Sequence, residues 1–475
     1  MTAALADNKI TLHSTATTEQ TETNNTTYTY YELLKATIDG NAVAYYLDSP
    51  ASDTLKGLLE AVTYTNASEA TVTPFTFTKS ADGTKWIATI SSDVATTDGV
   101  ALAAALNTAA IKAAAIASNY VTASGTSDVE ITVPNDGYYL IIASNGKNLA
   151  LQTIGDVTIT EKNTYPTIDK TQGDEDVATQ NHDDRDVAVG DVLTYNVTVH
   201  VPADAKTGDI IQVYDKATNG LSYNASSMTV TPSTASVADA TAENGDTWRK
   251  NITITSDVID QDVVFSFTMT VTDAALVDEG KENEAGLKYG NSDGWYYESK
   301  PVKVKYKTYY AGIHKVDGND TTVDLAGVKF DLKEDGVAFN VTLGNDGYYV
   351  PGGSSNEVVT DSQGRIMIRG LDEDKTYTLT ETYTLPGYNL LTTDVTLRLY
   401  EDTYTVVDEN GEQTVTTSFD PTKTNAAWGE VKNNKGAELP STGGIGTTLF
   451  YVGGGILVLA AVILLVTKRR MGAND

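Results

Sequence analysis

The residues with the clearest chemical potential are a lysine, a glutamate and an asparagine on expected β-strands. Lys315, Glu381 and Asn433 each lie two residues from an apolar residue of the same strand. Alternate residues of a strand point to one face, so these side chains should face a core, where an unpaired charge is costly. Burial drives amine and carboxyl groups toward their neutral forms, in which the amine is a nucleophile and the carboxyl group can polarise a carboxamide. The apolar neighbours are Ile313 for Lys315, Tyr377 and Leu379 for Glu381, and Val431 for Asn433. Asn434 is an alternative candidate for the role of Asn433.

The elements that position these residues are expected to be strands of antiparallel sandwiches. Apolar and polar residues alternate most clearly over residues 193–201 and 263–271, the pattern of a half-buried strand. Further strands are predicted over residues 28–38 and 138–143. The Ala-rich stretch 99–119 carries leucines and an isoleucine near helical spacing and predicts one helix.

Composition limits both the architecture and the partners. A chain of 475 residues is long enough for several domains. The net charge of -31 argues against nucleic acid as a partner. The absence of cysteine excludes disulfides and thiolate metal sites, and the four histidines show no ligand spacing, so no metal and no cofactor is expected.

The C-terminal region combines a short motif with an apolar segment. Residues 445–466 are apolar apart from Thr, Gly and Tyr451, which is long enough to span a bilayer, and Lys468-Arg469-Arg470 should stay cytoplasmic. Just upstream lies Leu439-Pro440-Ser441-Thr442-Gly443. The whole region resembles the LPxTG sorting signal of Gram-positive wall-anchored proteins. The resemblance implies that a sortase cuts between Thr442 and Gly443 and joins Thr442 to an amine, so the chain is a substrate and not an enzyme.

The rest of the chain divides into three blocks with family resemblances. The third, 305–434, resembles Cna B-type domains through LAGVKFDL, DSQGRIMIRGL, KTYTLTETYTLPGYNLL and WGEVKNNKG. The second, 165–304, resembles the middle domain of backbone pilins through TYPTIDKT, GDVLTYNVTV, IQVYDKATNGLSY and NEAGLKYGN. The first, 8–164, is similar more loosely to pilin N-terminal domains through TYTYYELLKATI.

These resemblances imply an all-β fold: tandem immunoglobulin-like or Cna-type β-sandwiches in a rod, followed by a transmembrane sorting helix. The remaining segments are a remnant of a signal region at 1–7, where Ala4-Leu5-Ala6 has the form of a signal-peptidase site, a spacer with the sorting motif at 435–444, the membrane helix at 445–467 and a basic tail at 468–475. An ordinary flexible N-terminus is the alternative for the first segment.

The same resemblance implies isopeptide bonds that form without an enzyme when a buried lysine displaces ammonia from an asparagine. In the third block the implied set is Lys315 and Asn433 with Glu381. In the second block it is Lys170 and Asn283 with Asp215, each on the apolar parity of its strand, and Asn291 competes with Asn283. In the first block Lys35 and Asn163 form a further candidate pair, for which no acid is clearly placed.

Backbone pilins also carry an acceptor lysine between their first and second domains, commonly in a YPK-type motif. Here the phrase is Tyr165-Pro166-Thr167, without that lysine. Lys162 is the nearest substitute. Along the strand it alternates with the apolar Val157 and Ile159, so its side chain should lie on the opposite face and point to solvent.

We therefore expect a structural subunit of a covalent surface pilus, secreted, held briefly in the membrane and then displayed at the cell wall. The expected partners are a pilus-specific or housekeeping sortase, other copies of the chain, peptidoglycan, and accessory pilins or a host surface ligand. The alternative is an accessory pilin or wall-anchored adhesin that binds a host ligand without polymerising.

Overall fold

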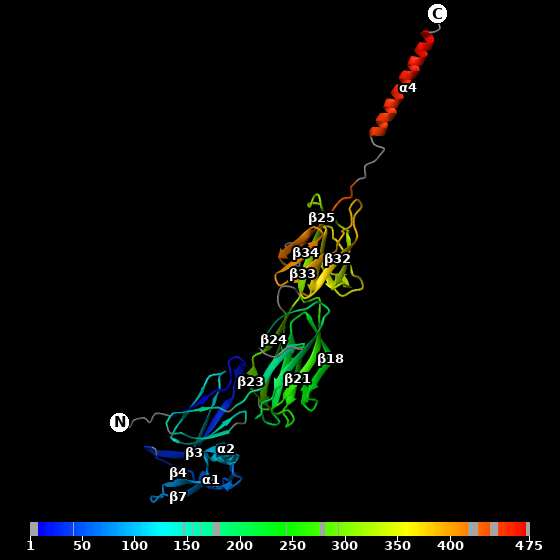
Figure 1. Ribbon diagram of the computed structural model, residues 1–475. Helices are drawn as coiled ribbons and strands as arrows, with labels where there is room; N and C mark the ends of the chain where they lie inside the picture. Colours follow the sequence, from blue (N-terminus) through cyan, green and yellow to red (C-terminus); the bar gives the residue numbers. More distant parts are fainter. Residues whose placement is uncertain are drawn as a thin grey trace.

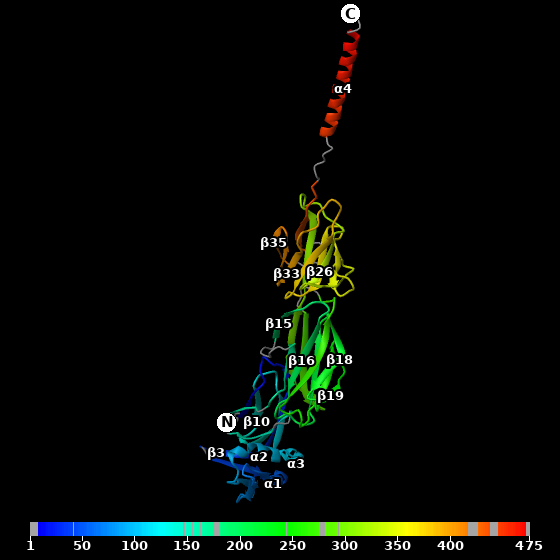
Figure 2. The ribbon, with the colours of Figure 1, turned by 45° about the vertical axis from the view of Figure 1, so that its right-hand side comes forward.

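The computed structural model is a rod of three β-rich domains followed by a separate C-terminal helix (Figure 1). A view turned by 45° shows the same order of domains along one axis (Figure 2). This architecture confirms the predicted fold class. The described residues are 8–40, 42–145, 148–153, 155–161, 163–173, 181–243, 245–275, 281–292, 294–416, 426–437 and 445–471.

The third domain is a sandwich of a 5-stranded and a 7-stranded sheet. Its first strand, β25, lies between β31, which is antiparallel to it, and the last strand, β36, which is parallel to it. The core between the sheets is rich in tyrosine, leucine and valine. The strands are β25 (Tyr309–Asp317), β26 (Lys329–Glu334), β27 (Val337–Ala338), β28 (Val341–Leu343), β29 (Tyr349–Pro351), β30 (Glu357–Val359), β31 (Arg365–Leu371), β32 (Thr376–Tyr383), β33 (Val395–Tyr400), β34 (Thr403–Asp408), β35 (Gly411–Thr416) and β36 (Gly429–Asn433).

The middle domain packs a 4-stranded sheet, ordered β14-β16-β21-β18, against an 8-stranded sheet. The two ranges with the clearest alternation are the paired strands β16 and β21, as predicted. The predicted boundary at residue 304 is wrong by a few residues, because it divides β24. The strands are β14 (Thr167–Gln172), β15 (Asn181–Asp186), β16 (Val192–His200), β17 (Ile210–Ala217), β18 (Leu221–Thr231), β19 (Ser236–Asp239), β20 (Trp248–Thr253), β21 (Asp262–Val271), β22 (Lys281–Asn291), β23 (Gly294–Ser299) and β24 (Val302–Lys307).

The first domain contains a 3-stranded sheet, a 7-stranded sheet and a short hairpin, with helices beside them. The elements are β1 (Asn8–His13), β2 (Thr21–Asn24), β3 (Thr27–Asp39), β4 (Ala42–Asp48), α1 (Asp53–Glu60), β5 (Tyr64–Thr65), β6 (Thr71–Val72), β7 (Phe75–Lys79), β8 (Lys85–Ile90), the 3-10 helix η1 (Thr96–Asp98), α2 (Gly99–Leu106), α3 (Ala109–Ala114), β9 (Ala117–Thr122), β10 (Val129–Val133), β11 (Gly137–Ala143), β12 (Asn148–Thr153) and β13 (Val157–Thr160).

The single helix predicted over 99–119 is wrong. The chain forms α2 and α3 instead, and the Thr108 side chain accepts a hydrogen bond from the N–H of Ile111, which caps the start of α3. Residues 117–122 are then drawn into the sheet as β9, antiparallel to β3. Pairing with a long strand outweighs the local helix propensity of an Ala-rich segment.

The first joint of the rod combines strand pairing with a ring contact, and the second contains a hydrogen bond between domains. At the first joint, β2 adds to β23 of the middle domain, and the rings of Tyr165 and Tyr297 stack with centroids 4.6 Å apart. At the second joint, Nη1 of Arg369 donates to the carbonyl of Asp273 at 2.8 Å. Residues 21–24 therefore belong to the sheet of the middle domain, although they fall in the first predicted block.

The C-terminal helix, α4 (Ile445–Met471), agrees with the predicted membrane segment and extends through the basic residues. It is long and apolar enough to cross a membrane over Gly446–Met471. It lies beyond the third domain at the end of the rod (Figure 1).

Candidate functional site: buried lysine, acid and asparagine sets

The third domain brings Lys315, Glu381 and Asn433 into contact in its core. The Nζ of Lys315 lies 2.5 Å from Oδ1 of Asn433 and 3.4 Å from Oε1 of Glu381. Lys315 and Asn433 come from neighbouring strands of one sheet, and Glu381 comes from β32 in the facing sheet. All three side chains are buried, as their alternation with apolar residues predicts. The alternative residue, Asn434, is exposed.

The environment of Lys315 favours the neutral amine. Its side chain is 0% exposed, and Nζ lies 5.7 Å from the ring centre of Phe330. Burial lowers the pKa of Lys315 to about 8, against the opposing effect of Glu381. A larger fraction of this amine is therefore unprotonated near neutral pH than for an ordinary lysine.

Glu381 is placed to move a proton between the reacting nitrogens. Its Oε1 accepts a hydrogen bond from Nδ2 of Asn433 at 2.9 Å, and the same oxygen faces Nζ of Lys315. One oxygen thus reaches both the amine that would attack and the nitrogen that would leave. The contact with Asn433 is within the reach of general acid-base catalysis, and the distance of 3.4 Å to Lys315 is slightly longer.

Two further residues hold this site, and sequence reasoning missed both. Nδ2 of Asn433 also donates to Oγ1 of Thr384 at 2.6 Å. Oε2 of Glu381 accepts from the backbone N–H of Leu391 at 2.7 Å. Both residues lie in the loop between β32 and β33, where no strand alternation signals which groups point inward.

The middle domain holds a second set with the same residue types. Lys170 on β14 is hydrogen bonded to Asp215 on β17, and both side chains are 0% exposed. Asn283, on the neighbouring strand β22, is also fully buried. Burial lowers the pKa of Lys170 and raises that of Asp215, so the pair is shifted toward its neutral forms. Asn291 lies at the far end of β22, at the turn to β23.

The surroundings of this second set are apolar. Nζ of Lys170 lies 5.2 Å from the ring centre of Tyr195 and 5.4 Å from that of Phe267. Oδ1 of Asp215 and Oδ1 of Asn283 have no hydrogen-bond partner among the described residues. Buried polar atoms are usually paired, so these two oxygens are exceptions in an otherwise apolar core.

The pair predicted in the first domain, Lys35 and Asn163, is wrong. Nζ of Lys35 pairs with Asp48 at 2.7 Å near the surface. Nδ2 of Asn163 donates to the hydroxyl of Tyr28 at 2.8 Å. Tyr28 and Lys35 lie seven residues apart on β3, or about 23 Å at the rise of a strand. Asn163, which contacts Tyr28, is therefore too far from Lys35 to react with it. Parity sets the face of a side chain but not its position along the strand.

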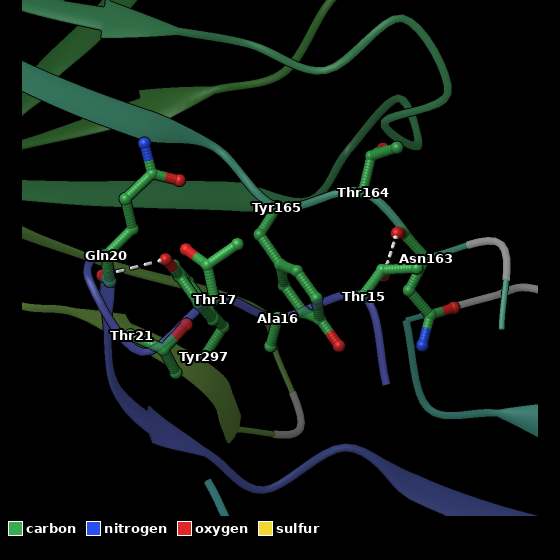
Figure 3. Close-up of a pocket in the computed structure, with 9 residues that line it drawn as sticks. All are labelled: Thr15, Ala16, Thr17, Gln20, Thr21, Asn163, Thr164, Tyr165 and Tyr297. Carbon is green, nitrogen blue, oxygen red and sulfur yellow. Dashed lines mark hydrogen bonds between the residues drawn. The ribbon is translucent and has the colours of Figure 1, made fainter. Parts of the chain in front are cut away.

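The predicted acceptor, Lys162, lies outside the described residues. Its neighbours Glu161 and Asn163 are both buried and hydrogen bonded to each other at 2.7 Å. Beside them is a cavity of about 500 Å³ at the first joint (Figure 3). It is lined by Thr15, Ala16, Thr17, Gln20, Thr21, Asn163, Thr164, Tyr165 and Tyr297.

The sorting motif, Leu439 to Gly443, also lies outside the described residues, between the end of the third domain and α4. Within the described ranges, no group of three or more His, Asp or Glu side chains could hold a metal ion.

Comparison with known families identifies the C-terminal part of the chain. Residues 310–413 match the model of the prealbumin-like fold domain named SpaA, and residues 431–471 match that of the LPXTG cell wall anchor motif. The second match confirms the predicted sorting signal. The chain is therefore a cell-wall-anchored surface protein with a prealbumin-like domain next to its anchor. A comparison with curated proteins gave no match.

The chain is also similar to solved pilin structures. The T6 backbone pilin of serotype M6 Streptococcus pyogenes is 14% identical, with coverage of 92% of this chain and 96% of the pilin and a TM-score of 0.47. The major pilin SpaA of Corynebacterium diphtheriae is 16% identical, with coverage of 90% and 100% and a TM-score of 0.46. The full-length major pilin SpaD of the same species is 15% identical, with coverage of 90% and 98% and a TM-score of 0.42.

Proposed function

We propose that this chain is the repeating subunit of a covalent surface pilus. One observation carries the proposal: the two domains with a buried lysine, acid and asparagine set are the two that lie between Lys162 and Thr442. In a polymer joined through these residues, tension would pass through the middle and third domains. The first domain would lie outside this path, and it lacks the corresponding contact between Lys35 and Asn163.

The joining reaction follows from the sorting motif. A sortase cysteine attacks the carbonyl carbon of Thr442 and releases the segment that begins at Gly443, with α4 attached. The Nζ of Lys162 in another copy then displaces the cysteine and forms an amide with Thr442. The last subunit of the fibre would be transferred to peptidoglycan, which retains the polymer at the wall.

The internal reaction strengthens each domain on this path. The neutral amine of Lys315 attacks the side-chain carbonyl carbon of Asn433. Glu381 takes the proton from the amine and returns a proton to the departing nitrogen, so that ammonia leaves and an amide remains. Asp215 would serve Lys170 and Asn283 in the same way.

The position of the third-domain bond suits a load-bearing role. It would join the first strand to the last, and the two residues are 118 positions apart in sequence. Force entering at Thr442 would reach β36 and pass through the covalent bond to β25. The rest of the domain would then carry little of the load.

The test is a denaturing gel of protein released enzymatically from the cell wall, probed for this chain. Wild type should give a ladder of high-mass species, and Lys162→Ala should reduce it to monomer. Lys206→Ala, at an exposed lysine of the middle domain, is the matched control and should keep the ladder. A ladder that survives in Lys162→Ala would reject this acceptor.

The second candidate function is an accessory pilin or wall-anchored adhesin. The departure from the usual acceptor motif at Tyr165-Pro166-Thr167 favours it. In that case the wild-type chain would run as a single monomer-sized band from the wall.

A further inference from the structure

An ion pair lies directly beside the proposed reacting pair of the third domain. Nζ of Lys435 is 2.6 Å from Oδ2 of Asp317, whose side chain is only 1% exposed. Asp317 comes two residues after Lys315, and Lys435 comes two residues after Asn433. The ion pair therefore ties together the same two chain segments that the isopeptide bond would join.

Two further hydrogen bonds fix the carboxylate of Asp317. Its carboxylate also accepts hydrogen bonds from the hydroxyl of Tyr388 at 2.9 Å and from the backbone N–H of Asn319 at 2.8 Å. The hydrogen bond from Lys435 lowers the pKa of Asp317 to about 2. The same contact raises the pKa of Lys435, so the pair stays charged throughout the neutral range.

The segment that carries Lys435 is also paired through its backbone with the loop between β32 and β33. The N–H of Asn389 donates to the carbonyl of Asn434 at 2.9 Å, and the N–H of Gly436 donates to that of Gly387 at 3.0 Å. The same loop supplies Thr384 to Asn433 and Leu391 to Glu381. One loop therefore contacts the acid, the asparagine and the segment that follows it.

Such support matters because Asn433 is the last residue of a short strand at the edge of its sheet. Strand ends fray, and β36 is held by parallel pairing to β25 alone within this sheet. Before a covalent bond exists, Asn433 stays near Lys315 only while the end of β36 is docked.

We propose that Asp317 and Lys435 are positioning residues for the isopeptide reaction, because their ion pair keeps the end of β36 docked on β25. This inference rests on the proposed function. Lys435 itself is paired with Asp317, whereas the amine of Lys315 contacts Asn433 directly at 2.5 Å.

The experiment follows bond formation in time. The full chain is made by cell-free translation with detergent micelles, and samples are denatured and digested at intervals. Mass spectrometry then measures the fraction of peptide in which Lys315 and Asn433 are joined with loss of one ammonia. Lys435→Gln should form the bond about threefold more slowly than wild type, the effect of losing one partly exposed ion pair. Lys435→Arg should restore the rate.

Lys432→Gln is the matched control. Lys432 lies on β36 itself and forms an ion pair with Glu430 at 3.0 Å on the outer face, away from Asn433. Its loss should leave the rate unchanged. Asp317→Asn is the second variant, because it removes the charge from the other side of the pair and keeps the size of the side chain. It should also slow the reaction.

The outcomes separate this inference from the proposed function. If no joined peptide forms in wild type, the isopeptide proposal itself fails. If the joined peptide forms in wild type and forms equally fast in Lys435→Gln and Asp317→Asn, the bond is real and the positioning role is wrong. Equal slowing in Lys432→Gln would also overturn that role, since any lost surface ion pair would then have the same effect.

Discussion

Asn433 lies directly opposite Asp317 in the parallel pairing of β25 with β36, and its Oδ1 is 2.5 Å from Nζ of Lys315, two residues earlier on β25. The reacting groups therefore meet diagonally across two neighbouring strands that begin and end the third domain. Covalent closure at this point needs only a small movement of side chains that are already in contact.

Asn433→Ala should abolish the bond of the third domain. The intact mass of the variant should fall short of the mass calculated from its own sequence by one ammonia fewer than in wild type. The domain should lose about 5 kcal/mol of unfolding free energy, because the bond closes a loop of more than a hundred residues. Mass spectrometry and calorimetry of the same preparation measure both effects. Asn434→Ala, at an exposed neighbour, should behave as wild type; loss of the bond in that variant would contradict the assignment.

Asp215→Asn should prevent the bond of the middle domain. The change leaves Lys170 without its buried acid, the group proposed to carry the proton to Asn283. The joined peptide of Lys170 and Asn283 should be missing from a digest of the variant. Asp262→Asn, at an exposed acid on β21, serves as the control and should leave the joined peptide intact. Detection of that peptide in Asp215→Asn would show that this acid is dispensable.

In the unlinked third domain, Lys315 should contribute increasing stability as pH rises from about 8 to about 10. In Asn433→Ala, Lys315 cannot react, and burial holds its folded-state pKa at about 8, below the ordinary lysine value of 10.5. Between these values Lys315 binds more protons in the unfolded chain than in the folded one, so its contribution to the free energy of unfolding increases with pH, by at most about 3 kcal/mol. Urea titrations at several pH values measure this increase. The double variant with Lys315→Met should lose the increase, and an equal increase there would rule out Lys315 as its source.

Pro440→Ala should trap the chain in the membrane. The predicted sorting motif would no longer be cut, so α4 would stay attached through its basic end. Cell fractionation should then find most of the protein with membranes and little of it bound to the wall. Ser441→Ala changes the variable position of the motif and should be processed normally. Equal wall attachment of the two variants would refute cleavage at this motif.

Local patterns were enough to predict which face each strand buries. Lys315, Glu381 and Asn433 were all assigned to the core by alternation alone, and all three are buried there. The reason is geometric, because successive residues of a strand point to opposite faces whatever the strand pairs with. The same local logic predicted α4 from the length of one apolar segment.

Position along a strand and choice of partner could not be predicted in this way. Lys35 and Asn163 share the expected parity, but Lys35 contacts Asp48 whereas Asn163 contacts Tyr28, seven residues away from Lys35 on β3. The stretch 99–119 has helical composition, yet its end becomes a strand because β3 offers an open edge. Likewise, nothing local in residues 21–24 indicates that they pair with β23, more than 260 residues later.

The sequence by itself thus determined the sorting signal, the strand faces and the residue types of two reactive sets, because each depends on neighbours within a few positions. Only the tertiary structure decided which of these residues meet. It brought Lys315 to Asn433 across the first and last strands, kept Lys35 from Asn163, and added Thr384, Asp317 and Lys435 around the site. Such contacts depend on sheet register and loop closure over long distances, which no local pattern records.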